Sequence, residues 1–280
     1  YRDTQNERTG GTSSTASLGI PGSTGLIPTD SSSASTPVPL PIPLLASGVS
    51  ARTLSVIEPW LTERNVYLTA GAGGKAAADA EHRFDPGSPL AVILATGDLT
   101  LGGVGTITQR EGDRLIAFGH PMLGSGTTEL PIGGAEIVDV VSNYRISFKL
   151  SNIGEVAGTL WQDSTPGIQG ELGRIPYMIP VSVHSDAAVK SPIEGQLAEH
   201  RQFSPMMALT YAAQTLFTAT EGPSESTTYG ELTVEVESVD EPLTFSRIGV
   251  GIGGAIDVLF TFADQLDTIL NGTQEFPRIE

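Results

Sequence analysis

The sequence has no cysteine, few aromatic residues and no long apolar run. Without cysteine the chain can form neither a disulfide nor a thiolate zinc site, and it has no cysteine nucleophile. No apolar stretch reaches the roughly 20 residues that a membrane-spanning helix needs. Basic residues are also scarce: 15 Lys and Arg stand against 32 Asp and Glu, which gives a net charge of −17. That balance argues against a nucleic acid or an anionic membrane as the partner.

Glycine and proline, in contrast, are abundant, with 33 and 19 residues in a chain of 280. Such a composition predicts short strands joined by many turns. Alternating strand patterns recur between Glu129 and His184 and are interrupted by Gly and Pro. Strands at this spacing favour a closed or nearly closed β-barrel. We therefore expect a mainly β fold with a few helices.

The chain divides into three segments by composition. Residues 1–36 are rich in Ser, Thr, Gly and Pro and predict a linker, which could be ordered only by docking on a neighbouring surface. Residues 37–200 carry the β pattern. Residues 201–280 predict a helix-strand-helix extension packed on the barrel. Its three elements are a helix that starts at Ser204-Pro205, a strand over Tyr229–Asp240 and a helix over Ala255–Leu270.

A β-hairpin is predicted within the stretch Gly97–Gly126. Val104, Thr106 and Thr108 alternate as β-branched residues, and Glu111-Gly112-Asp113 supplies a polar turn with glycine. The short apolar run Leu115–Phe118 is typical of a buried returning strand.

His120 follows this hairpin, between Gly119 and Pro121. A residue before proline is biased towards an extended or turn conformation, so His120 should be held rigidly at a strand end. One interpretation is a structural histidine that satisfies a backbone carbonyl. The other is a general base, since a rigidly positioned imidazole suits proton transfer near neutral pH.

Two motifs, one that contains His120 and one that follows it in the chain, resemble the SpoIVB peptidase family. In these bacterial serine peptidases a Gly-Thr-x-Thr strand leads through a turn to a Gly-His motif. The matching residues are Gly105-Thr106-Ile107-Thr108, Phe118-Gly119-His120-Pro121, and the later Gly158–Asp163 and Gly167–Gly170. The similarity runs from about Pro37 to the C-terminus and weakens after Ser185. The resemblance implies that His120 is the catalytic base, that the barrel could be trypsin-like, and that the protein is secreted or in the cell envelope.

The sequence departs from the family in one respect: it has no Gly-Met-Ser-Gly-Ser-Pro nucleophile motif. We therefore expect this chain to be the His-bearing part of a longer multidomain peptidase that acts on protein or peptide. The nucleophile would come from another segment or chain of the same protein, so the isolated chain should be inactive. The alternative is a non-catalytic scaffold or protein-interaction module that retains the peptidase-family fold.

Two further residues are secondary candidates within the chain. Asp163 could orient the imidazole of His120 through its far ring nitrogen, or it could cap a turn before Pro166. Ser125, in Gly124-Ser125-Gly126, is the best internal candidate for the nucleophile, although a glycine-rich turn also accounts for it. His184 and His200 are too isolated in the sequence to indicate a metal site, and no cofactor is expected.

Overall fold

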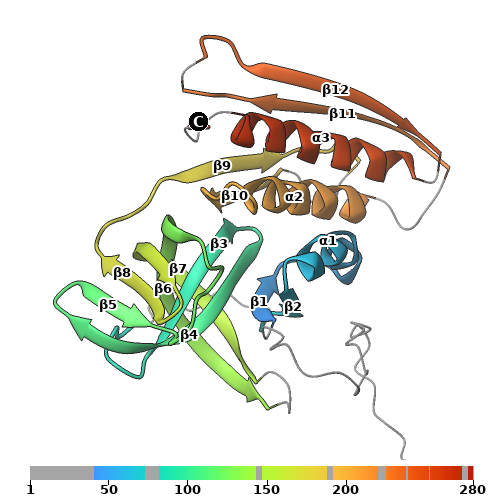
Figure 1. Cartoon of the computed structure of the whole chain (residues 1–280). Coiled ribbons are helices and arrows are strands. Elements are labelled where there is room, and N and C mark those ends of the chain that lie inside the picture. Colours follow the sequence, from blue (N-terminus) through green and yellow to red (C-terminus); the bar gives the residue numbers. More distant parts are fainter. Residues whose placement is uncertain are drawn as a thin grey trace, which may run out of the picture. The chain divides into compact units, whose positions relative to one another are not determined.

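The computed structural model describes residues 41–72, 82–142, 147–187, 192–219, 225–237, 239–251, 253–272 and 277–279. The linker expected over residues 1–36 lies outside these ranges. All described residues belong to one compact unit, Pro39–Glu280. They form a mainly β fold with three helices, as the sequence predicted (Figure 1).

The helices are α1 (Ala51–Glu63), α2 (Ser204–Ala219) and α3 (Gly254–Asn271). The strands are β1 (Ile42–Ser47), β2 (Val66–Ala70), β3 (Pro89–Gly97), β4 (Thr100–Glu111), β5 (Arg114–Ala117), β6 (Gly126–Val141), β7 (Phe148–Ser164), β8 (Gly167–Leu172), β9 (Met178–Val183), β10 (Ile193–Ala198), β11 (Thr227–Val234) and β12 (Leu243–Val250). The two helices of the expected extension are present, but two strands, β11 and β12, lie between them in place of the single strand expected over Tyr229–Asp240.

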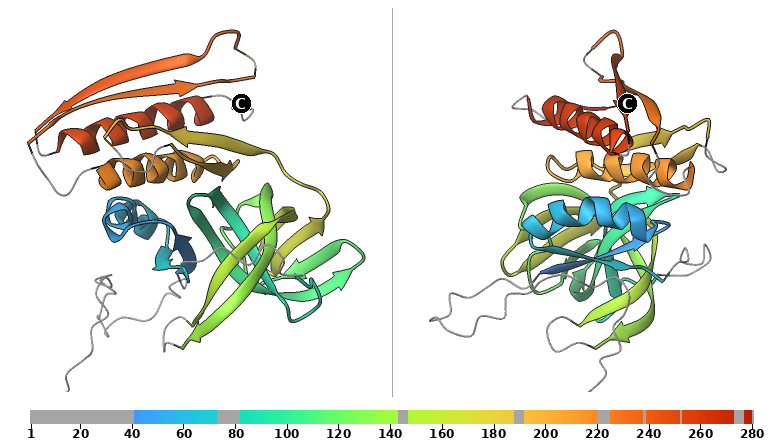
Figure 2. Two further views of the ribbon diagram at one scale, coloured as in Figure 1. Left: turned by 180° about the vertical axis from the view of Figure 1, so that it is seen from behind. Right: turned by 90° about the vertical axis from the view of Figure 1, so that its right-hand side faces the viewer.

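Six strands are hydrogen-bonded in a ring. Following the pairings from β3 leads through β4, β5, β8, β7 and β6 and back to β3, and every pairing is antiparallel. The result is a ring-like, partly barrel-like sheet (Figures 1 and 2). Strand β3 buries all of Leu90–Ala95, which explains why its sequence is continuously apolar rather than alternating.

Two pairs of strands extend this sheet beyond the ring. Strand β1 pairs with β4 and carries β2 in parallel, and β10 pairs with β3 and carries β9. Ser50 caps the N-terminus of α1, and its side chain accepts a hydrogen bond from the Thr53 N–H. The Gln214 side chain of α2 accepts hydrogen bonds from both the Ser50 N–H and the Thr53 hydroxyl, which ties α1 to α2.

The C-terminal elements form layers of their own. Helix α2 contacts β9 and β10 as well as α3, and α3 contacts the two-stranded sheet of β11 and β12. The figures show α3 between α2 and this small sheet (Figures 1 and 2). Apolar residues of α2 and α3, among them Met207, Leu209, Leu259 and Leu270, are buried. Among the described residues, no helix is both long and apolar enough to span a membrane.

Candidate functional site

The hairpin that leads to His120 is formed by β4 and β5, as the sequence predicted. Gly112-Asp113 makes the connection, and Gly112 has φ +60°, which glycine adopts without steric cost. Beyond β5 the chain makes a sharper bend. Phe118 and Gly119 both have left-handed backbone angles, φ 71° and φ 74°. A bulky residue at positive φ is strained, and such residues persist mainly where the surrounding structure holds them.

Packing on Gly105 holds Phe118 in this conformation. The Phe118 ring lies so close to Gly105 that a Cβ atom there would overlap it. The Phe118 N–H also donates to the Thr106 carbonyl at 2.9 Å. The glycine of the Gly105–Thr108 motif thus makes room for the aromatic residue that precedes Gly119-His120. The two halves of the first motif are in direct contact.

His120 is exposed at the end of this bend. Its Nδ1 lies 2.8 Å from the Pro121 carbonyl oxygen. Because a carbonyl can only accept, Nδ1 must carry the proton in this contact, and Nε2 of the neutral ring is then an acceptor. Within the described part of the chain Nε2 makes no hydrogen bond. The Phe118 ring flanks the imidazole, with 5.7 Å between ring centroids.

Asp163 is buried and holds the segment that follows His120. Its carboxylate accepts four backbone N–H groups: those of Met122 and Leu123, each at 2.7 Å, Gly124 at 2.8 Å and Ser125 at 3.3 Å. The residue is only 1% exposed. A buried carboxylate needs such donors to offset its desolvation. Asp163 therefore caps the loop after His120. Among the described residues its carboxylate makes no hydrogen bond to the His120 ring or to the turn before Pro166.

Ser125 faces a different histidine. Its hydroxyl lies 3.0 Å from Nε2 of His200, which is 75 residues away in the sequence. Nδ1 of His200 accepts the N–H groups of Gln202 and Phe203, at 3.2 and 3.3 Å. Nδ1 is therefore unprotonated, and the proton of the neutral ring is on Nε2, which donates to Ser125. Burial lowers the pKa of His200, and the nearby Asp163 only partly opposes that shift.

This geometry decides which of the candidate residues come together. His120, Asp163 and Ser125 lie around one loop, 121–125, but neither Asp163 nor Ser125 hydrogen-bonds the His120 ring. Ser125 is paired with a histidine that donates a hydrogen bond to it, whereas a general base must accept the hydrogen bond of the nucleophile's hydroxyl. The Ser125–His200 pair therefore lacks the arrangement of a nucleophile and its base.

His200 is the residue of this network that the sequence did not indicate. Its partner is far along the chain, and no spacing signal links the two. Lys149 was also missed: its ammonium donates to the Gly105 carbonyl at 3.2 Å and to the Thr106 hydroxyl. Partial burial lowers the pKa of Lys149. Among the residues that the structure describes, no three His, Asp or Glu side chains gather to hold a metal ion.

Comparisons of the chain with protein-family models, with curated proteins and with solved structures find no match.

Proposed function

We propose that the chain is part of a SpoIVB-like serine endopeptidase and supplies its general base, His120. The observation that supports this most directly is the state of the His120 ring. Nδ1 donates to the Pro121 carbonyl, and Nε2 is left as an exposed acceptor. The strained, closely packed bend at Phe118 keeps the ring at this position. Rigid placement of a base is what proton transfer requires.

In this proposal Nε2 of His120 takes the proton of a serine hydroxyl as the serine oxygen bonds to the carbonyl carbon of a peptide. The resulting imidazolium then gives that proton to the departing amine, so that the peptide C–N bond breaks and an acyl-enzyme remains. The Pro121 carbonyl fixes the tautomer, a role that a carboxylate has in a Ser-His-Asp triad. A neutral carbonyl stabilises the imidazolium less than a carboxylate would.

The serine would come from outside this chain, from another segment or chain of the same protein. Ser125 is unsuited to the role because His200 donates to it. The substrate would be protein or peptide. The six-stranded antiparallel ring is compatible with the trypsin-like barrel that the family resemblance implies.

Labelling with a serine-reactive fluorophosphonate tests the proposal. The chain is expressed with the coding sequence that flanks it, so that a nucleophile-bearing segment is present. We expect labelling that becomes at least about a hundredfold slower in His120→Ala, because a general base contributes that much or more. His184→Ala, which removes another exposed histidine, should label normally. Labelling that survives in His120→Ala at the wild-type rate would refute the role of His120.

Ser125→Ala tests whether the nucleophile lies within this chain. If Ser125 is structural, this variant should label like the wild type. The isolated 280-residue chain, without its flanking segments, should then not label at all. Loss of labelling in Ser125→Ala would show that the nucleophile is internal and would contradict the proposal of an external serine.

A second candidate function is a non-catalytic interaction module that retains the fold. It is favoured by the engagement of Asp163 and Ser125 in other contacts, which leaves His120 without a carboxylate on its ring within the described residues. This candidate predicts that the flanking coding sequence contains no Gly-x-Ser-Gly motif. Finding such a motif there would remove its main support.

A further inference from the structure

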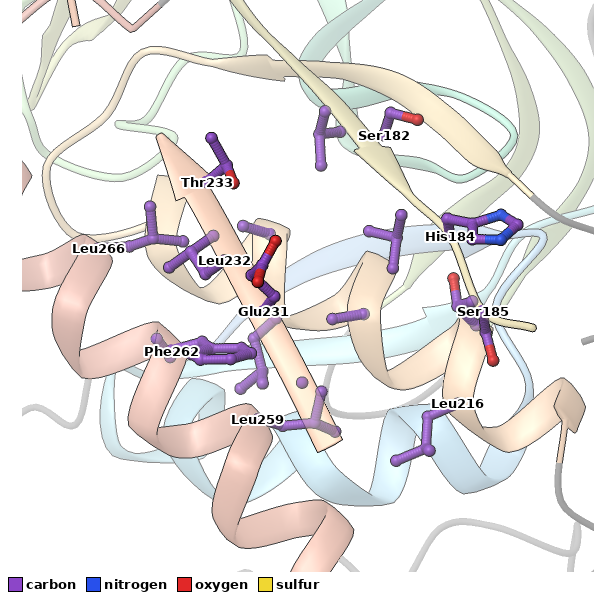
Figure 3. A pocket seen from close by; sticks show the side chains of 18 of the residues that line it. Ser182, His184, Ser185, Leu216, Glu231, Leu232, Thr233, Leu259, Phe262 and Leu266 are labelled. Carbon is purple, nitrogen blue, oxygen red and sulfur yellow. The ribbon is translucent and has the colours of Figure 1, made fainter. Parts of the chain in front are cut away.

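A large cavity lies between the β9 edge of the main sheet and the two-stranded sheet of β11 and β12. It has a volume of about 1260 Å³ and is lined along its length by β9 and β11, with α2 and α3 beneath. Figure 3 shows Leu216 of α2 and Leu259, Phe262 and Leu266 of α3 lining it. Pockets for small ligands usually measure about 300–1,000 Å³, so this cavity suits a longer occupant.

Both strands beside the cavity have an edge that no strand covers within the described residues. Strand β9 pairs only with β10, and β11 pairs only with β12. The pairing pattern shows which backbone groups are turned away from these partners. The Ser226 carbonyl accepts the Gly251 N–H, so in the regular register the N–H and C=O groups of Tyr229, Glu231 and Thr233 point to the uncovered edge.

Strand β9 also turns backbone groups away from its partner strand. Glu194 of β10 exchanges hydrogen bonds with Asp98, so its backbone groups face β3, and those of Gly195 face β9. In β9 the Ser182 N–H and carbonyl and the Pro180 carbonyl therefore point away from β10. Within the described residues the cavity is thus bounded by two strand edges whose outward backbone groups pair with no other strand, so that an added strand could bond to them.

Side chains around the cavity divide by face. Towards the helices the lining is apolar, as with Val181 of β9 and Leu232 of β11. Among the described residues that line the cavity there are four carboxylates and no Lys or Arg: Asp186, which pairs with His184, and Glu194, Glu231 and Glu235. Glu231 alternates with Leu232 along β11 and so lies on the outer face. In a strand placed between β9 and β11, alternate side chains would face the apolar helices and the acidic outer face.

We infer that this cavity is a groove between β9 and β11 that binds an extended segment of a partner protein by strand addition. Apolar and basic residues alternate along that segment. The segment's backbone would pair with the edges of β9 and β11 and join the two sheets. Its apolar side chains would fill the space above Phe262 and Leu266, and its Lys or Arg side chains would meet the carboxylates. A lipid chain would fill the volume but would leave the backbone edges unpaired.

The test uses a capped peptide of about seven residues in which Val or Ile alternates with Lys. Its binding to the full chain is measured by fluorescence anisotropy. Thr233→Pro removes an N–H that points into the groove, without removing a bond between β11 and β12. Thr244→Pro is the matched control, because Thr244 lies directly opposite Thr233 and its N–H points to the far edge of β12. We expect at least tenfold weaker binding for Thr233→Pro and wild-type binding for Thr244→Pro.

Charge specificity gives a second, independent readout. Replacing Lys by Glu in the peptide should abolish binding, and Glu231→Lys should weaken binding of the Lys peptide. Equal binding by the two proline variants, or equal binding of the Lys and Glu peptides, would overturn the inference. Two other outcomes, each without peptide binding, would also overturn it. In one, the chain forms a homodimer that Thr233→Pro dissociates and Thr244→Pro does not. In the other, residues 1–36 are protected from hydrogen exchange, and only Thr233→Pro removes that protection. The variants leave His120 intact, so this test is independent of the peptidase proposal.

Discussion

The surroundings of His120 and of His200 are opposite in chemistry, although both rings contact the segment 121–125. At His120 the backbone supplies an acceptor to Nδ1, and no described residue bonds to the other nitrogen, which can accept a proton. At His200 the backbone supplies donors to Nδ1, and the other nitrogen donates to Ser125. One ring is exposed and the other largely enclosed. The backbone partner of Nδ1, rather than the presence of a nearby serine, determines which histidine could act as a base.

Asp163 lies between these two environments, and its removal should have the largest effect. In Asp163→Asn an NH₂ group replaces one carboxylate oxygen and faces backbone N–H donors. We expect the free energy of unfolding to fall by about 3 kcal/mol or more, because several charge-assisted hydrogen bonds are lost and buried donors stay unpaired. Urea denaturation measures this loss.

Asp98→Asn is the matched control for this prediction. Asp98 also accepts a backbone N–H, that of Glu194 at 2.9 Å, but it is not buried. Its replacement should cost no more than about 1 kcal/mol. If the two variants were equally stable, Asp163 would not be the group that holds the loop, and the separation of the two histidines would need another cause.

Local chemistry explains how much of this arrangement the sequence predicted. The hairpin of β4 and β5, its Gly112 turn and the helix start near Ser204 follow from residues that are adjacent in the chain. The mainly β fold follows from strand patterns separated by Gly and Pro. These features need no knowledge of distant partners.

The rest depends on contacts between distant residues. Asp163 meets a loop about 40 residues earlier in the chain, and Ser125 meets His200 across 75 residues. Neither contact has a local signature, because a single carboxylate or imidazole can cap any loop that the fold brings to it. The order of strands in the ring, and the edges of β9 and β11 that no described strand covers, are likewise set by tertiary pairing. The sequence could therefore name the candidate residues but could not pair them.

Gly105→Ala should disturb the His120 side alone, with an intermediate effect. The new methyl group would overlap the Phe118 ring, and overpacking of this kind costs about 1–3 kcal/mol. We also expect the NMR signals of His120 to shift while those of His200 stay in place. A double-mutant cycle provides the control: in a Phe118→Ala background the ring is gone, and Gly105→Ala should cost much less. Additive effects of the two substitutions would contradict the proposed contact.

The smallest effect is the pH dependence that the buried His200 adds to the stability of the fold. Burial lowers the pKa of His200 in the folded chain below its ordinary value of about 6.5. As the pH falls below that value, the unfolded chain takes up the proton before the folded chain does. The contribution of neutral His200 to stability is therefore complete above about pH 6.5 and is lost as the pH falls through the folded pKa. Protonation would also place an N–H on Nδ1, against the donors of Gln202 and Phe203.

His200→Asn keeps an acceptor for these two N–H groups but cannot titrate. We expect its free energy of unfolding, measured by urea denaturation at pH 7 and pH 5, to fall less than that of the wild type over this interval. His184→Asn, which removes a histidine whose side chain is 68% exposed, should behave like the wild type. If His200→Asn lost as much stability as the wild type between these pH values, the buried ring would not be the titrating group. The contrast between the two histidines would then rest on hydrogen-bond geometry alone.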